Sequence, residues 1–186
     1  DSFWSFSHAL KFISKKAAVP PLGLITVSAM LPSTWKKKLV DMNITTLRTS
    51  DIQWADYVFI SAMYIQKESV NKIIAECKKL NKKIVAGGPL FTQDYKEYPE
   101  IDHFILNEAE LTMPLFLSDL RIGQPQKLYK TKEFADLSQT PVPDFQLLSA
   151  KDYAFMNIQV TRGCPFNCNF CEITSLFGHK VRMKSA

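Results

Sequence analysis

Between residues 56 and 120, apolar strands alternate with amphipathic helices, and this alternation sets the narrowest limits on the fold. Residues 56–63 are almost continuously apolar, which is typical of a strand that is covered on both faces of its sheet. Residues 69–81 instead repeat apolar side chains at helical spacing, with lysines on the other side. The expected strands are 56–63, 83–86 and 103–106, and the expected helices are 69–81 and 111–120. Because strands alternate with helices, we predict an α/β fold with a doubly wound parallel sheet.

The segments outside this region carry weaker patterns. We expect a helix over 22–31, which Pro32 ends, and a strand over 36–44. Residues 121–152 show little periodicity and contain several prolines, which is typical of a linker. The predicted organisation is therefore an N-terminal aromatic segment at 1–19, an α/β domain at 20–120, a linker at 121–152 and the beginning of a second domain at 153–186.

The aromatic segment at the start of the chain also contains lysines. It could lie on a membrane surface, but packing over the domain that follows is more usual, and we expect the latter. No apolar run approaches the ~20 residues of a membrane span, and no secretory signal is evident. Three clustered cysteines and a lone Cys77 do not resemble a disulfide framework. We therefore expect a cytoplasmic protein.

The charge pattern predicts a solvated surface. The chain has 186 residues and a net charge of +5 at pH 7, from lysines scattered over expected helix ends and turns. Lysines at such places complement the helix dipole and keep surfaces soluble. A nucleic-acid interface would require a basic patch with base-stacking aromatic side chains on one face, and we expect no nucleic acid as a partner.

Three of the four cysteines lie within eight residues, in the stretch Cys164-Pro-Phe-Asn-Cys168-Asn-Phe-Cys171. Residues 156–161 alternate like a strand before it, and residues 173–177 are expected to begin a helix after it. Thiolates that can reach a common point from a tight loop are what a metal ion or an iron–sulfur cluster requires. The loop would follow the C-terminal end of a strand, where α/β folds place their chemistry.

The number of thiols distinguishes the kinds of site. A closed structural zinc site needs four Cys or His ligands, as does a cluster used only for electron transfer. This loop supplies three, so a cluster bound here would keep one iron open. Zinc is the alternative, with His179 completing a Cys3His set, although the gap from Cys171 to His179 is longer than the usual finger spacing.

The spacing Cys-x3-Cys-x2-Cys, with an aromatic residue before the last cysteine, resembles the signature of the radical S-adenosylmethionine enzymes. The resemblance implies that Cys164, Cys168 and Cys171 bind a 4Fe–4S cluster whose open iron chelates S-adenosylmethionine, with Phe170 near the adenine. It implies reduction by a protein such as flavodoxin or ferredoxin, cleavage to a 5′-deoxyadenosyl radical, and hydrogen abstraction from a small-molecule substrate. A complete barrel needs on the order of 200 residues, so residues 153–186 would form only its first βα unit.

The loops after the expected strands resemble the cobalamin-binding domain that precedes many radical S-adenosylmethionine barrels. In that family a Gly-Gly-Pro stretch with a nearby threonine follows the central helix, as Gly87-Gly88-Pro89 and Thr92 do here. A Gly-Glu-Gly-Glu stretch often follows the next strand, here altered to Asn107-Glu108-Ala109-Glu110. The resemblance implies cobalamin contacts from the strand-end loops, namely Asn43, Ser61, Gly87, Gly88, Pro89, Thr92 and Glu108.

Some of these residues have a second explanation, and one motif of the family is missing. Adjacent glycines equally fit a tight turn, and Glu108 and Glu110 equally fit a helix N-terminus, where free amide groups stabilise carboxylates. Many cobalamin domains carry Asp-x-His-x-x-Gly, whose histidine ligates cobalt, whereas this chain has Asp41-Met42-Asn43-Ile44-Thr45-Thr46. The resemblance therefore implies cobalamin without a histidine ligand at this loop, or a domain that has lost the cofactor.

These resemblances predict the N-terminal part of a cobalamin-type radical S-adenosylmethionine enzyme. Methyl transfer and ring rearrangement are among the reactions of this class, and residues 1–186 alone are expected to be inactive. The alternative is a non-catalytic module that binds a corrinoid or another small ligand and holds structural zinc at its cysteines.

Overall fold

The computed structural model describes residues 7–184, which form two compact units. The first, which we call the sheet unit, comprises Thr49–Thr140 and Val160–Ala186. The second, the flanking unit, comprises Asp1–Arg48 and Pro141–Gln159. Each unit combines two separate segments of the chain. The consecutive domain boundaries proposed from the sequence stay a prediction.

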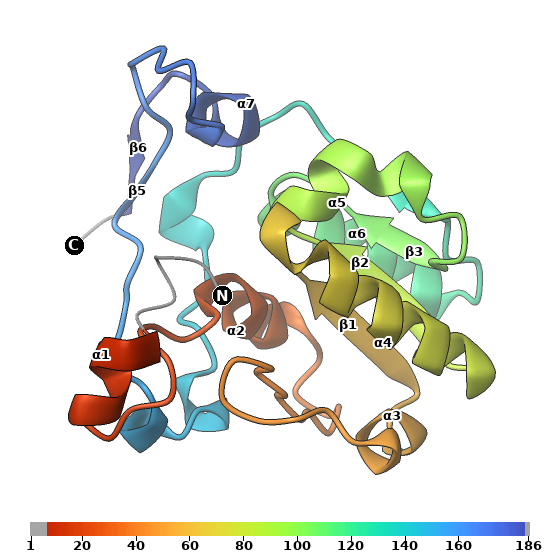
Figure 1. The fold of residues 1–186 in the computed structure, drawn as a ribbon. Coiled ribbons are helices and arrows are strands. Elements are labelled where there is room, and N and C mark those ends of the chain that lie inside the picture. The colour runs from red at the N-terminus through yellow and green to blue at the C-terminus, as the bar shows by residue number, and fades with distance from the viewer. Residues whose placement is uncertain (1–6, 185–186) are drawn as a thin grey trace. The chain divides into compact units, whose positions relative to one another are not determined.

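Four parallel strands in the order β1-β2-β3-β4 form the centre of the sheet unit (Figure 1). The strands are β1 Tyr57–Ser61, β2 Lys83–Gly87, β3 His103–Ile105 and β4 Leu128–Tyr129. Ser61 pairs with Gly87, and Gly87 pairs with Ile105, so the first three strands end level with one another. The predicted α/β fold with a parallel sheet is therefore confirmed.

Helices cover both faces of this sheet (Figure 1). They are α4 Lys67–Lys79, α5 Pro89–Asp94 and α6 Ala109–Arg121, while the short helix α3 Thr49–Trp54 precedes β1. Neighbouring residues of a strand point to opposite faces. On β3, His103 contacts Phe116 of α6 with ring centroids 5.3 Å apart, whereas Phe104 contacts Phe91 of α5 at 6.2 Å. The sheet is thus doubly wound, as predicted.

Aromatic and aliphatic side chains from these helices and strands fill the core. Phe91, Phe104 and Phe116 are fully buried, and each such side chain contributes ~1.5–3 kcal/mol relative to an exposed one. The helical spacing seen in the sequence of α4 buries Val70 and Cys77 on the face toward the sheet. Sequence patterning therefore identified the two long helices correctly.

Several short elements were not predicted from the sequence. They are α3, α5, β4, and the antiparallel pair β5 Thr161–Arg162 and β6 Arg182–Met183. The strand expected at 156–161 is wrong except for its last residue, because only residues 161 and 162 pair with another strand, β6. Ile158, whose alternation suggested a strand, is 75% exposed. The helix expected at 173–177 is confirmed as α7 Ile173–Phe177.

The flanking unit contains α1 Ser7–Phe12 and α2 Leu22–Met30, which agrees with the helix expected at 22–31. The strand expected at 36–44 is wrong. Residues 42–45 form a turn in which the amides of Ile44 and Thr45 both donate to the carbonyl of Asp41 at 3.0 Å. The Asp41 carboxylate also accepts from the amide of Asn43 at 2.9 Å, a local hydrogen bond that competes with strand pairing.

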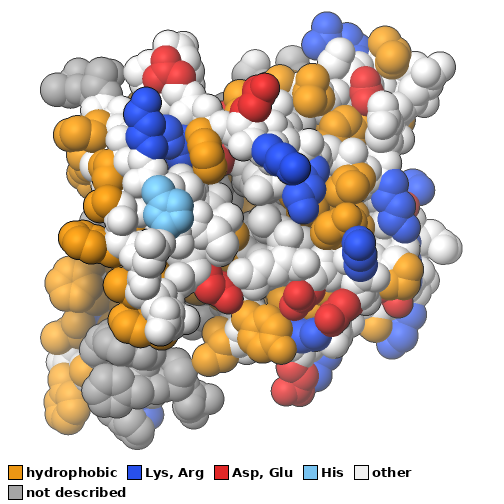
Figure 2. Space-filling model, turned by 90° about the horizontal axis from the view of Figure 1, so that it is seen from above, with side chains coloured by type: hydrophobic (Ala, Val, Ile, Leu, Met, Phe, Trp, Pro, Cys, Tyr) orange, Lys and Arg blue, Asp and Glu red, His pale blue; other side chains and the backbone are white. Residues whose placement is uncertain are grey.

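The structure bears on the expectations about membrane contact and about the charged surface. Among residues 7–184, no helix is both long enough and apolar enough to cross a membrane. Phe3, Trp4 and Phe6 of the aromatic segment lie outside the described residues, so its predicted packing stays a prediction. On the face drawn in Figure 2, lysine and arginine side chains lie interspersed with carboxylates and hydrophobic side chains.

Candidate functional site

The level carboxyl ends of β1, β2 and β3 bring together most of the residues that the sequence singled out. Ser61 ends β1 beside Gly87 at the end of β2. The amide of Leu90, in the first turn of α5, donates to the carbonyl of Ala62 at 3.1 Å, so α5 begins beside the end of β1. The amide of Asn107 donates to Oγ1 of Thr92 at 3.3 Å and connects the end of β3 to the same helix. Ser61, Gly87, Gly88, Pro89, Thr92 and Glu108 all belong to the sheet unit, whereas Asn43 belongs to the flanking unit.

Internal packing already accounts for both glycines. A Cβ on Gly87 would lie 2.6 Å from the carbonyl oxygen of Ile105 on the neighbouring strand. Gly88 has a φ of +86°, and a Cβ there would lie 2.6 Å from Oγ of Ser61. The Gly-Gly pair is therefore explained by the close approach of β1, β2 and β3, and a ligand is not needed to explain it.

Asn107 is a functional candidate that the sequence reasoning passed over. It has a φ of +65°, a region that glycine and asparagine tolerate best, which explains why it replaces the first glycine of the Gly-Glu-Gly-Glu pattern. Its Oδ1 atom is buried and has no hydrogen-bond partner. Buried polar atoms in folded proteins nearly always have partners, so this atom is suited to accept a hydrogen bond from a ligand. The signal in the sequence was the Gly-to-Asn change itself.

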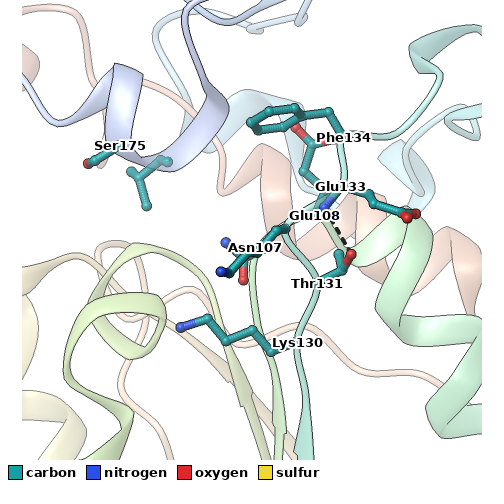
Figure 3. A pocket seen from close by; sticks show the side chains of 9 residues that line it. Asn107, Glu108, Lys130, Thr131, Glu133, Phe134 and Ser175 are labelled. Atoms are coloured by element: carbon teal, nitrogen blue, oxygen red, sulfur yellow. Dashed lines mark hydrogen bonds between the residues drawn. The ribbon is translucent and has the colours of Figure 1, made fainter.

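A pocket of about 190 Å³ opens beside Asn107. In Figure 3, Asn107 and Lys130 extend from the strand ends on one side of the pocket, and Ser175 of α7 lies on the other. Lys130 also places its ammonium group 5.4 Å from the centre of the Tyr95 ring. The volume is below the ~300–1,000 Å³ of pockets that enclose drug-sized ligands, so it suits one polar part of a large cofactor.

The residues at the strand ends offer the types of polar group that can bind a corrinoid. They offer a buried acceptor at Asn107, hydroxyl groups at Ser61 and Thr92, and the cation of Lys130, all at the sheet edge where doubly wound folds bind ligands. No histidine stands in the loop that carries the cobalt ligand in many relatives of the expected family. In its place, Asn43 donates from Nδ2 to the Asp41 carboxylate at 2.8 Å, and that carboxylate accepts from the Tyr153 hydroxyl at 3.0 Å.

The three clustered cysteines lie on one loop between β5 and β6, which we call the cysteine loop (residues 163–181). All three thiols are free; those of Cys164 and Cys171 are half-buried and that of Cys168 is exposed. The amide of Cys171 donates to the carbonyl of Cys168 at 3.0 Å, which closes a tight turn between the two. Phe170 is 91% exposed, so its side chain contributes nothing to the core.

The donor set of this loop fits an iron–sulfur cluster chemically, because three reduced thiols are accessible within eight residues. Over residues 7–184, however, no three His, Cys, Asp or Glu side chains converge as metal ligands. This holds for the three cysteines and for the Cys3His set with His179. The three side chains would have to turn toward a common point to bind a metal.

Two arginines at the base of the cysteine loop were also missed from the sequence. Arg182 donates from both Nη atoms to Glu108, at 2.8 and 2.5 Å, and Arg162 donates to Glu110 at 2.6 Å. Burial alone would raise the pKa of Glu110, but the hydrogen bond and charge of Arg162 outweigh this effect and hold that pKa below its ordinary value. Because both carboxylate oxygens of Glu108 accept from Arg182, Glu108 forms an ion pair within the protein, and a position at a helix N-terminus alone does not explain it. Its predicted contact with cobalamin stays a prediction.

Comparison with known proteins identifies a family for more than half of the chain. The sequence profile of the B12 binding domain matches residues 13–117, more than half of the chain. A protein named as an uncharacterized methyltransferase from Synechocystis is 39% identical over 98% of this chain and 34% of its own length.

Two further relatives have more specific names. The hopanoid C-2 methylase of Rhodopseudomonas palustris is 31% identical over 99% of this chain and 36% of its own length. A bacteriochlorophyllide d C-8(2)-methyltransferase of Chlorobaculum tepidum is 26% identical over 88% of this chain and 37% of its own length. The chain spans about a third of the length of these curated relatives.

Proposed function

Because this chain belongs to the family of B12-binding domains, we propose that it binds cobalamin at the carboxyl ends of β1, β2 and β3 as part of a methyltransferase. The names of three relatives that align with 88% or more of the chain support the methyl-transfer assignment. Bound cobalamin would supply a methyl group that is carried on its cobalt. The substrate is a small molecule with an unreactive carbon, since methylation of such carbons is a reaction that needs so demanding a cofactor.

We propose further that the enzyme is of the radical S-adenosylmethionine type. Cys164, Cys168 and Cys171 would hold a 4Fe–4S cluster, with Phe170 near the adenine of S-adenosylmethionine. Such a cluster, reduced by a flavodoxin or ferredoxin, would supply the electron that generates a 5′-deoxyadenosyl radical. The exposure of Phe170 and Cys168 is suited to this role, because both side chains are accessible to an incoming cofactor.

The chain's own residues would bind and orient these cofactors. Asn107 would accept a hydrogen bond through its buried Oδ1, and the hydroxyl groups of Ser61 and Thr92 would contact polar groups of cobalamin at the strand ends. Gly87 and Gly88 would allow β1, β2 and β3 to end close together, so that the polar groups at their ends lie near one another. Glu108, which is bonded to Arg182, would act from the edge of the site, and the contact expected of Asn43 stays a prediction.

One observation carries the proposal: the sheet unit contains both the strand ends of a B12-binding domain and a loop with three free, accessible thiols. A B12-binding domain that only carried a corrinoid would have no use for such a loop. A structural zinc site needs four ligands, whereas the cysteine loop offers three thiols, and the gap from Cys171 to His179 is longer than the usual finger spacing.

Anaerobic reconstitution of the complete gene product with iron and sulfide tests the cluster. We expect about four irons per chain and a broad visible absorption band. Cys168→Ala should abolish both, whereas Cys77→Ala is the matched control that should retain them. Cys77 is buried, and burial raises the pKa of its thiol to about 11, so it stays protonated and is no competing ligand. Stoichiometric zinc without a visible band would contradict the proposal.

Titration with hydroxocobalamin tests the other half of the proposal. Binding should change the visible spectrum of the corrinoid and raise the melting temperature of the protein, because a ligand that binds only the folded state stabilises it. Saturating hydroxocobalamin that changes neither quantity would show that the domain has lost its cofactor.

A further inference from the structure

The base of the cysteine loop places two like charges opposite each other. Arg162 of β5 pairs directly with Arg182 of β6, and the hydrogen bond from the amide of Lys184 to the carbonyl of Val160, at 2.9 Å, extends the same ladder. Like charges at opposed positions of a ladder destabilise it. Groups that neutralise both guanidinium groups therefore favour the pairing of the two strands that closes the loop.

Two carboxylates at the start of α6 supply that neutralisation, from Glu108, which directly precedes the helix, and from Glu110 in its first turn. The side chain of Glu108, which is only 1% exposed, forms a two-pronged hydrogen-bonded pair with Arg182 and accepts from the amide of Ala135 at 2.7 Å. Glu110 pairs with Arg162 and also accepts from the hydroxyl of Thr140 at 2.9 Å.

Further contacts hold Arg182 in one orientation. Its guanidinium lies 4.7 Å from the centre of the Phe134 ring, and it donates to the carbonyls of Ala135 and Phe177 at 3.0 and 3.1 Å. Phe177 ends α7, inside the cysteine loop. The contacts of Arg182 thus connect the end of β3, the segment after β4 and the cysteine loop itself.

We propose that Glu108 and Glu110 are positioning residues that fix the cysteine loop to the carboxyl end of β3. Asn107, which faces the pocket, directly precedes Glu108, and Cys164 follows Arg162 after a single glycine. These ion pairs therefore form a short connection from the corrinoid side of the site to the first proposed cluster ligand. A ligand at the strand ends orders the cysteine loop through them. This inference rests on the proposed function where it concerns the cluster, and on the geometry alone where it concerns the loop.

Amide hydrogen exchange in the metal-free complete gene product tests the positioning role. Glu108→Gln should speed exchange over residues 163–181 by ~10-fold, while β1 and β2 keep their protection. Glu68→Gln is the matched control, because Glu68 forms an exposed pair with Lys72 on the same unit and should leave the loop unchanged. A general loss of stability would instead speed exchange in every strand. If Glu108→Gln does not fold, Arg182→Lys keeps the charge, removes the two-pronged pairing and should give the same loop-specific effect.

Two further measurements use the cofactors. Hydroxocobalamin should slow exchange over residues 163–181 in the wild-type protein and not in Glu108→Gln. After reconstitution, a chelator should remove iron ~10-fold faster from Glu110→Gln than from Glu68→Gln, the usual order of effect when groups that support metal ligands are changed. Unchanged loop exchange in both Glu108→Gln and Arg182→Lys would overturn the inference. If the wild-type protein binds no iron, the proposed function fails, and the exchange experiment on metal-free protein still decides whether the ion pairs position the loop.

Discussion

Replacing Gly163 with alanine should open the cysteine loop at its base. Gly163 lies between Arg162 and Cys164 with a φ of +90°, and a Cβ there would lie 2.2 Å from the carbonyl oxygen of Lys180. That oxygen belongs to the backbone on the opposite side of the loop, so it cannot move aside as a flexible side chain would. The alanine variant must therefore separate residue 163 from residue 180.

The size of the effect follows from two contributions. A left-handed φ costs an alanine roughly 1–2 kcal/mol. Opening the loop also breaks the hydrogen bond from the amide of Cys164 to the carbonyl of Gly178, at 3.1 Å, and weakens the β5–β6 ladder beside it, at ~0.5–1.5 kcal/mol for each bond. We expect Gly163→Ala to lower the free energy of unfolding by about 3 kcal/mol in total.

Two other glycines separate these contributions. Gly123 has a φ of +74° and nothing within 4 Å of a Cβ, so Gly123→Ala should lose only the ~1–2 kcal/mol of the left-handed backbone. Gly23 lies in α2 with open space around it, so Gly23→Ala should be stabilising by up to about 1 kcal/mol. Urea unfolding followed by circular dichroism measures all three variants. If Gly163→Ala and Gly123→Ala agree within about 0.5 kcal/mol, the close approach of residues 163 and 180 does not exist in solution.

Two further predictions concern the sheet and its carboxyl edge. Asp102 accepts from the amide of Ile84 and from Lys78 and Lys83, at 3.0, 3.2 and 2.8 Å; burial would raise its pKa, but these hydrogen bonds lower it overall. Asp102→Asn should therefore lower the free energy of unfolding by about 1 kcal/mol near neutral pH. Only the ionised carboxylate is stabilised by folding, so urea unfolding should show this difference vanishing as the pH falls below 3.8, the pKa of an unperturbed aspartate. Asn107→Gly keeps the positive φ and should leave the melting temperature nearly unchanged, whereas Asn107→Ala should cost about 1 kcal/mol or more. Both Asn107 variants should weaken hydroxocobalamin binding, and a titration with unchanged affinity would remove Asn107 from the site.

The parts of the fold that could be predicted from sequence are those in which periodicity and length agree. The apolar run of β1 and the helical spacing of Val70 and Cys77 each permit one interpretation, because burial on both faces of a sheet and on one face of a helix leave different patterns. Residues 36–44 misled the prediction. The alternation there was real, but the Asp41 carboxylate accepts from the amide of Asn43 and its carbonyl accepts from two further amides, so the chain forms a turn.

The residues of the candidate site likewise divide into those that a local sequence pattern indicates and those that depend on contacts between distant parts of the chain. The cysteine spacing is a local signal, so it could be read directly from the sequence. The pairing of Glu108 with Arg182 joins residues 74 positions apart, and no local pattern reports such a contact. The unpartnered oxygen of Asn107 likewise depends on what surrounds it in three dimensions. Gly87 and Gly88 were linked to cofactor binding from the sequence, and only the structure shows that neighbouring strands already require them.

Electron paramagnetic resonance of the reduced, reconstituted gene product, recorded with and without S-adenosylmethionine, tests the central claim most directly. A cluster held by Cys164, Cys168 and Cys171 alone keeps one iron open, so S-adenosylmethionine should change the signal of the reduced cluster. A cluster signal that S-adenosylmethionine leaves unchanged would mean that no iron of the cluster binds S-adenosylmethionine. The protein would then not be a radical S-adenosylmethionine enzyme, even if it binds cobalamin.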